Sequence, residues 1–171
     1  LDYETAASYT LSLNASDGVN TTTFELIITV DDVNEAPSLS NTLAASSFAE
    51  NVSTGTIIAT ASASDPESQA ITYSLSGTGS EYFTIDSSGN VTLAAGLDYE
   101  TATSYTLTLN ASDGVNTTSS NLIITVDDVN EAPSLSNTLA ASSFAENIAT
   151  GTTIATASAS DPESQTITYS L

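Results

Sequence analysis

The stretch DDVNEAP occupies residues 31–37 and recurs at residues 127–133, 96 positions further along the chain. The copying extends beyond it: residues 1–75 align with residues 97–171 without a gap, and only nine of the 75 pairs differ. Repetition of this length at a fixed period indicates tandem structural units. We therefore expect residues 38–133 to form one complete repeat, residues 1–37 the C-terminal part of a repeat, and residues 134–171 the N-terminal part of another.

Partial repeats on both sides of a complete one have two explanations. A gene product seldom starts and stops inside a domain, so we interpret the sequence as a window on a longer array. The alternative is a filament, in which the C-terminal part of one chain completes the N-terminal part of the next.

The charge is one-sided and excludes several classes of protein. The chain has 21 acidic residues, no lysine, arginine or histidine, and a formal charge of −21. Binding of nucleic acid needs basic residues, so nucleic acid is excluded as a partner, and an anionic membrane surface is disfavoured. No apolar run approaches the roughly 20 residues of a membrane span, so we expect no membrane insertion by this segment. Cysteine is absent, which excludes disulfides and thiolate metal sites.

Apolar residues at every second position predict β-strands with one buried face. Alternation is clear at Tyr105, Leu107, Leu109 and Ala111, and turn residues such as Asp113-Gly114 separate the alternating segments. We expect about seven strands in a repeat, near 44–48, 56–63, 70–75, 81–85, 90–94, 103–112 and 117–127. This number and spacing predict an all-β Greek-key β-sandwich of immunoglobulin-like architecture, repeated in tandem.

Sixteen of the 21 acids fall in five short clusters that recur with the repeat. In the complete repeat these read FAEN, SDPE, LDYE, ASDG and DVNEAP, and the strand assignment places them at the two ends of the sandwich. Carboxylates crowded there without a base would repel one another by several kcal/mol in total. Calcium relieves such repulsion, because it takes six to eight oxygen ligands. A solvated acidic surface is the alternative, but its acids would lie on outward strand positions, which here hold Ser and Thr.

The same five clusters resemble, in order, the motifs of the cadherin repeat, and in particular the bacterial cadherin-like domains of large tandem-repeat surface adhesins. The family pattern runs PEN, DxD, LDRE, AxDxG and DxNDNxP, and it covers the full period. The resemblance implies calcium at each junction between repeats. This chain departs from the pattern at Tyr99, which replaces the arginine of LDRE, and at Ala36 and Ala132, where the shorter linker lacks an asparagine. We therefore expect about two ions per junction, with three as the upper figure.

The resemblance also implies which residues hold the metal. The first junction would use Asp2, Glu4, Asp32, Asn34, Glu35, Asp65, Glu67 and Asp113. The second junction would use Glu50, Asp98, Glu100, Asp128, Asn130, Glu131, Asp161 and Glu163. The first lacks an upstream glutamate and the second lacks a final aspartate, whereas Asp17 and Glu146 would serve further junctions.

We therefore expect a calcium-rigidified extender segment of a large extracellular adhesin or surface protein, whose partners are neighbouring repeats of the same chain. The alternatives are a subunit of a self-assembling calcium-dependent filament, with other copies as partners, and a module that binds a ligand through Thr-rich faces. Without His, Cys or Lys there is no ordinary base for a nucleophilic serine, so we expect no enzyme activity and no catalytic residues.

Overall fold

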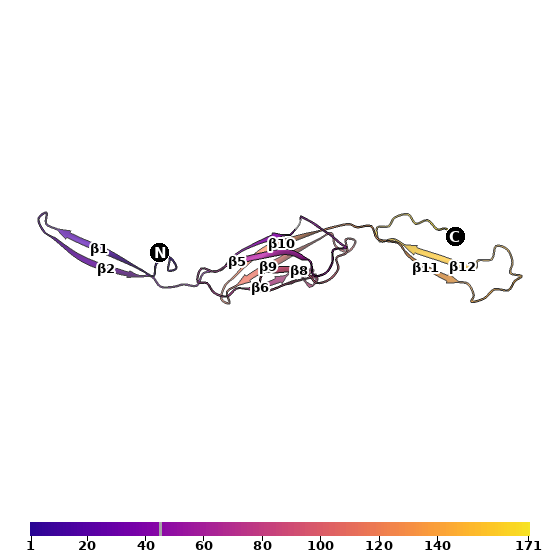
Figure 1. Cartoon of the computed structure of the whole chain (residues 1–171), viewed down its shortest axis with the longest axis horizontal. Helices are drawn as coiled ribbons and strands as arrows, with labels where there is room; N and C mark the ends of the chain where they lie inside the picture. Colours follow the sequence, from indigo (N-terminus) through magenta and orange to yellow (C-terminus); the bar gives the residue numbers. More distant parts are fainter. Residues whose placement is uncertain (45) are drawn as a thin grey trace.

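The chain forms an extended rod with three parts in sequence order (Figure 1). A computed structural model describes residues 1–44 and 46–171. The hairpin of β1 (Ser8–Ser16) and β2 (Thr21–Thr29) lies at one end, and the pair β11 (Ser134–Leu139) and β12 (Ala155–Ser160) lies at the other. Between them is a two-sheet sandwich. Short extended linkers join the three parts.

The sandwich contains two four-stranded sheets. One sheet has the order β4-β10-β9-β6 and the other the order β3-β5-β8-β7, and the pairing is antiparallel except between β4 and β10. The strands are β3 (Ser38–Leu43), β4 (Phe48–Ala49), β5 (Ile57–Ser64), β6 (Thr72–Ser76), β7 (Phe83–Ile85), β8 (Asn90–Leu93), β9 (Ser104–Ser112) and β10 (Thr117–Asp127). A single 3-10 turn, η1 (Ser80–Tyr82), precedes β7 among the described residues. This confirms the predicted all-β sandwich.

Six of the seven predicted strands agree with the structure to within about two residues at each end. The first prediction, 44–48, is wrong for the described residues, and residue 45 lies outside them. Two short strands flank that segment instead: β3 ends at Leu43, and β4 begins at Phe48 in the opposite sheet. The first strand is therefore divided, because the chain crosses between sheets there. β3 pairs with β5 in one sheet, and β4 pairs with β10 in the other.

The core follows the alternation read from the sequence. Leu107, Leu109, Leu122 and Ile124 are at most 1 % exposed. The residues between them that point outward carry hydroxyl or amide groups, except for Ile123, which is exposed. Tyr105 closes one end of the core against Phe83, with ring centroids 5.4 Å apart in an edge-to-face arrangement. Ser120 occupies an inward position that holds Phe24 in the other copy. It lies in a polar pair, since its hydroxyl accepts from Asn41 Nδ2 at 3.0 Å.

The outer strand pairs repeat the local structure of the sandwich without its covering layer. β1 and β2 pair in the same register as β9 and β10, and β11 and β12 in that of β3 and β5. Their apolar side chains are accessible: Leu13 is 64 % exposed where Leu109 is 0 %, and Ile154 is 52 % exposed where Ile58 is 0 %. Near-identical sequences therefore differ in burial only because one set has an opposing sheet.

The matched pair Leu109 and Leu13 gives a direct test of this difference. We expect Leu109→Ala to lower the free energy of unfolding of the sandwich by about 2–5 kcal/mol, because it removes buried methyl groups and leaves a cavity. Leu13→Ala should change it by less than about 0.5 kcal/mol. Urea unfolding in dilute solution measures both. Similar losses from the two variants would mean that the hairpin contributes to the same cooperative unit.

Candidate metal centres

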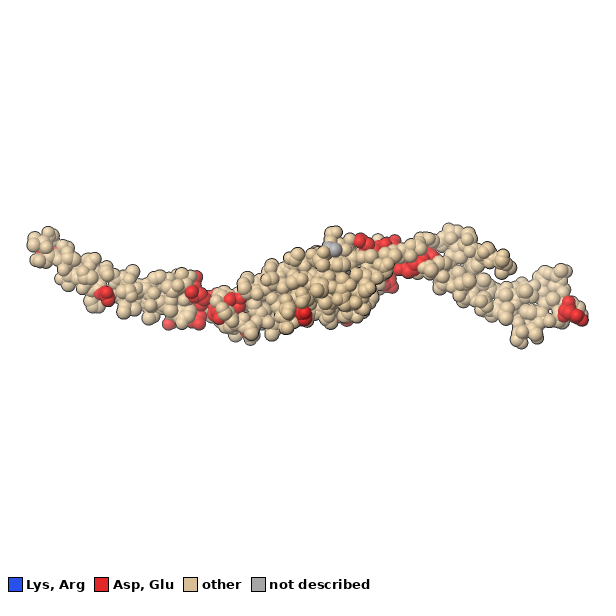
Figure 2. Space-filling model, viewed as in Figure 1, with Lys and Arg blue, Asp and Glu red and all other residues tan. Residues whose placement is uncertain are grey.

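Acidic side chains gather at both linkers, where one part of the rod meets the next (Figure 2). The LDYE segment contributes through a tight turn. Asp98 Oδ1 accepts from Thr101 N at 2.9 Å, and Ala102 N donates to Asp98 O at 2.9 Å. Asp2 makes the corresponding bonds with Thr5 and Ala6. The first acid of the motif thus shapes the turn that presents the second acid, Glu4 or Glu100, to the linker.

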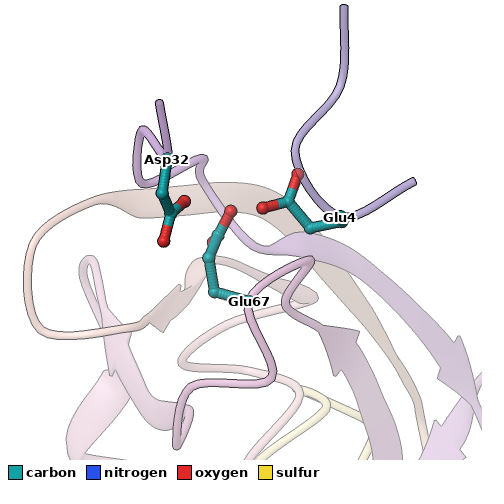
Figure 3. A group of neighbouring side chains, drawn as sticks. All are labelled: Glu4, Asp32 and Glu67. Atoms are coloured by element: carbon teal, nitrogen blue, oxygen red, sulfur yellow. The ribbon is translucent and has the colours of Figure 1, made fainter. Parts of the chain in front are cut away.

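At the first junction three carboxylates converge from three segments. Ligand atoms of Glu4, Asp32 and Glu67 all lie within 4.8 Å of one another. Figure 3 shows their side chains pointing toward a common space, Glu4 from the N-terminal turn, Asp32 from the linker and Glu67 from the loop after β5. The chain has no basic side chain to neutralise them.

The linker asparagine of the first junction is held by hydrogen bonds. Asn34 Nδ2 donates to Asp113 Oδ2 at 2.8 Å and to Glu35 O at 3.0 Å, and Asn116 Nδ2 donates to Asn34 O at 3.2 Å. The side-chain amide of Gln69 donates to Asn34 Oδ1. Asp113 therefore lies at this junction, as expected, and it contacts the linker through the asparagine.

At the second junction two carboxylate groups share one residue. Glu50, Glu100 and Glu131 form one, and Glu100, Asp128 and Glu163 form the other, each with ligand atoms within 4.8 Å of one another. Glu50 is 6 % exposed, and its two oxygens accept from Tyr99 N and Val129 N, both at 2.7 Å. Glu50 thus connects the LDYE turn to the linker, and Glu100 lies between the two groups.

Half of the sixteen expected ligand residues fall in these groups. Six further acids join no such group among the described residues: Asp2, Glu35, Asp65, Asp98, Asp113 and Asp161. The two linker asparagines, Asn34 and Asn130, are held by hydrogen bonds. Sequence reasoning missed Gln69 and Gln165, which hold the linker asparagines Asn34 and Asn130. The available signal is the identical continuation of both SDPE copies to SDPESQ, although glutamine is a common surface residue and carries no metal signature.

Several buried carboxylate oxygens at the junctions lack a hydrogen-bond donor among the described residues. They are Asp65 Oδ2, both Oε atoms of Glu67, Glu131 Oε2 and Glu163 Oε2. Burial of an unpaired carboxylate is costly, and buried charges are normally paired or bound to metal. The side-chain atoms available here as metal ligands are all oxygens, which fits a hard cation such as calcium and disfavours metals that prefer thiolate. The residues present therefore fit calcium.

The carboxylates also perturb one another's ionisation. The adjacent Glu163 carboxylate raises the pKa of Glu131 to about 7, because it accepts a hydrogen bond from Glu131 only when Glu131 is protonated, and the same interaction lowers the pKa of Glu163. Glu35 and Glu67 interact in the same way at the first junction, where the pKa of Glu35 is raised to about 7 and that of Glu67 is lowered. Partial desolvation, followed by the charges of Glu50, Asp128 and Glu163, raises the pKa of Glu100. In the absence of a cation, each pair therefore retains a proton near neutral pH.

This fold and these sites define a class of protein: β-sandwich modules arranged in tandem, with acidic junctions lined by oxygen atoms. Residues 45–127 match the family profile described as "Cadherin domain". The chain belongs to the cadherin-repeat family. Cadherin domains in general bind calcium at the junctions between repeats.

Individual relatives agree with this assignment. The chain is similar to Cadherin-23 of Homo sapiens, with 35 % identity over 173 residues that cover 95 % of this chain and 5 % of that protein. Among solved structures it resembles protocadherin gamma B2 extracellular cadherin domains 3–6, with 30 % identity, a TM-score of 0.63, and coverage of 95 % of this chain and 41 % of that one. It also resembles a protocadherin gamma B7 cis-dimer, with 27 % identity, a TM-score of 0.59, and coverage of 95 % and 41 %.

The chain thus spans a small part of Cadherin-23 and about two fifths of the solved neighbours. These relatives are cadherins and protocadherins rather than enzymes, which agrees with the expectation of no enzyme activity. The solved neighbour from gamma B2 consists of extracellular cadherin domains, which agrees with the expected extracellular location. The described residues form no helix with the length and apolarity of a membrane span. The expectation of a bacterial surface protein stays a prediction.

The carboxyl pairs predict a pH dependence in the metal-free chain. A raised pKa in the folded state gives Glu131 a stabilising effect that is complete below its ordinary pKa of 4.5 and is lost as the pH rises through about 7. We expect the second junction to loosen between about pH 5 and pH 8, because Glu131 then ionises beside the Glu163 carboxylate, which is already charged. NMR titration of the glutamate side chains in chelator measures this, with Glu131→Gln as a control that keeps a donor at every pH. An ordinary pKa for Glu131 would contradict the pairing.

Proposed function

We propose that this segment is a calcium-rigidified extender of a large extracellular adhesion protein. Each repeat adds on the order of 40 Å, from strands of about ten residues at 3.3 Å each and a linker, and the array holds a distal binding module away from the cell. The convergence of three carboxylates at each of three places along the linkers, in a chain without a base, is the observation that carries the proposal. Near-identical repeats suit a spacer, in which length matters more than the identity of any face.

The proposal divides the chain as the repeat period does. Residues 38–133 are the complete repeat, residues 1–37 the C-terminal part of the preceding one, and residues 134–171 the N-terminal part of the following one. The accessible apolar residues of the outer strand pairs support this, because their counterparts in the sandwich are buried. Residues outside this sequence would cover them in a longer array.

The metal would be held by residues from both sides of each linker. At the first junction these are Glu4, Asp32 and Glu67, with Asp2, Asn34, Glu35, Asp65 and Asp113 around them. At the second they are Glu50, Glu100, Asp128, Glu131 and Glu163, with Asp98, Asn130 and Asp161 around them. Bound calcium would supply positive charge to the crowded oxygens. Consecutive repeats would then hold one orientation relative to each other. The reason is that a single carboxylate group combines residues from the turn, the linker and the next repeat.

Removal of calcium should affect the junctions more than the sandwich. The sandwich has its own apolar core, so it should stay folded in chelator, whereas the linkers have only repelling acids and should become hinges. Small-angle scattering with and without chelator should show an extended rod that becomes flexible, while circular dichroism shows little loss of strand. A rod of unchanged stiffness in chelator would mean that packing sets the angle between consecutive repeats. The proposal that calcium rigidifies the extender would then be wrong.

A single ligand tests the site more sharply. Glu100 belongs to both groups of the second junction, so Glu100→Gln removes a charge from each. We expect calcium affinity at that junction to fall about tenfold or more, which is about 1.4 kcal/mol. Glu81→Gln is the matched control, because Glu81 is exposed and belongs to none of the carboxylate groups among the described residues. Isothermal titration calorimetry compares the two variants, and equal effects would indicate that only overall charge attracts calcium.

A further inference from the structure

An open cavity lies on the side of the central sandwich, where η1 meets the start of β9. Its volume is about 480 Å³, within the range of about 300–1,000 Å³ that small-molecule sites occupy. All of its lining residues lie between residues 78 and 106. None of them belongs to a group of converging carboxylates in the part of the chain that the structure describes. The cavity is therefore separate from the candidate metal centres.

Two tyrosines form the aromatic part of the lining. The rings of Tyr82 and Tyr105 have centroids 5.3 Å apart and are tilted by 44°. Tyr105 is buried against Phe83, and any side chain at Gly79 would collide with its ring. Gly79 also has a φ of +83°, a conformation that glycine adopts readily. Tyr105 is thus fixed in place, whereas Tyr82 is only half-buried and presents the more accessible ring.

Exposed polar groups surround the two rings. The lining includes the carboxylate of Glu81 and four hydroxyl side chains, those of Thr78, Thr101, Ser104 and Thr106. The backbone of β9 is also open here. β6 pairs with β9 only as far as Thr108, so the edge of β9 beside the cavity has no neighbouring strand on that side among the described residues.

The tyrosine hydroxyl groups at the cavity are unpaired. Tyr73 Oη accepts from Ala63 N at 3.0 Å, but the hydroxyl groups of Tyr82 and Tyr105 make no hydrogen bond to another described residue. A buried tyrosine hydroxyl usually has a partner. Burial, followed by electrostatic interaction with Tyr82, Asp98 and Glu81, raises the pKa of Tyr105, so its hydroxyl stays protonated. It can therefore donate to a ligand or to water in the cavity.

We propose that this cavity binds a neutral saccharide. A pyranose ring has an apolar face of C–H groups, which packs on an aromatic ring, and hydroxyl groups that both donate and accept hydrogen bonds. The C–H face would contact Tyr82. Glu81 would accept from sugar hydroxyl groups, and Thr78 and Thr106 would bond to others. The bond to Glu81 would be the strongest polar contact, because its acceptor is charged.

Other classes of ligand fit this lining less well. The chain has no basic side chain to pair with an anion, and Glu81 would repel one. A quaternary ammonium group is recognised by the faces of several aromatic rings. Here Tyr105 is covered by Phe83 and Gly79, which leaves Tyr82 as the accessible ring. Such a cation would also leave the surrounding hydroxyl groups without partners, whereas a sugar uses both the ring and the hydroxyl groups.

The outer face of the same sheet extends this uncharged surface beyond the cavity. The next outward pairs along β9 and β6 are Thr108 with Ser76 and Asn110 with Ser74, which carry only hydroxyl and amide groups. A longer saccharide would continue along these pairs, so a disaccharide should bind more tightly than a monosaccharide. This activity goes beyond the proposed extender, because the spacer itself would contact a glycan.

NMR titration of backbone amides in the 171-residue chain tests the site. The probes are cellobiose, maltose and lactose, each up to about 50 mM, in the presence of calcium. We expect at least one of them to produce saturable shifts at Gly79, Glu81, Tyr82 and Thr106, with a dissociation constant of about 1 mM. Glucuronate and choline are the anionic and cationic comparison probes, and they should produce no saturable shift at these amides.

Two substitutions of exposed residues test the assigned contacts without disturbing the core. Glu81→Gln should weaken disaccharide binding about tenfold, because it removes the charged acceptor. Thr106→Val should weaken it about threefold, because it removes one hydroxyl group and keeps the shape. Glu25→Gln and Thr117→Val are the matched controls. Glu25 and Thr117 are exposed strand residues outside the cavity, so binding should be unchanged.

The absence of shifts with all three disaccharides would overturn the proposal. Shifts with choline alone would overturn it in favour of a cation site, and equal weakening by the test and control variants would overturn it in favour of non-specific contact. Calcium titration of the same chain separates the saccharide site from the proposed function. Calcium binding without saccharide binding would refute only the saccharide site. Saccharide binding without calcium binding would refute only the metal-dependent extender.

Discussion

Repulsion between unpaired carboxylates is the constraint on which the rest of this molecule depends. Lysine, arginine and histidine are absent, so no acid can be neutralised by a side chain of the same protein. The acids are nevertheless concentrated at the linkers, where Glu100 is near Glu50, Asp128 and Glu163. We therefore expect the shape of the rod to depend on the surrounding solution, because protons or cations from it can offset the negative charge at the linkers. The sandwich, which is held by apolar packing, is largely independent of these ions.

The two copies of each strand separate intrinsic pairing from tertiary packing. β1 and β2 keep the register of β9 and β10 although their apolar side chains face solvent, which shows that the turn and the backbone ladder set the pairing. Burial comes from the second sheet alone. The pair Phe24 and Ser120 fits this view, because Ser120 accepts a hydrogen bond from Asn41 of the second sheet, whereas Phe24 on the uncovered hairpin is 67 % exposed.

The sequence was sufficient to predict the long strands and the acidic junctions. It was insufficient where a strand's position or a side chain's role depends on residues that are distant in the sequence. Strand 117–127 was predicted with its observed ends, because apolar and polar residues alternate along it and a turn precedes it. The first strand was misplaced, because Ala and Ser between Leu43 and Phe48 carry no period and the division between β3 and β4 depends on which sheet edge is free. The motif was sufficient to place Glu100 among the acids of the second junction, whereas its role as a metal ligand stays a prediction. The amides of Gln69 and Gln165 were missed, since their role arises only from the nearness of the linker asparagine.

The parallel pairing of β4 with β10 has a mechanical consequence. Val126 lies opposite Phe48 and Asp127 opposite Ala49, and Glu50 N donates to Asp127 O at 3.1 Å. β10 leads directly into the second linker, whereas β4 is tethered to the first linker through β3. Tension along the rod therefore pulls these two strands in opposite directions along their length. The bonds between them are loaded in shear and share the load, whereas an antiparallel pair pulled at one end would open one bond at a time.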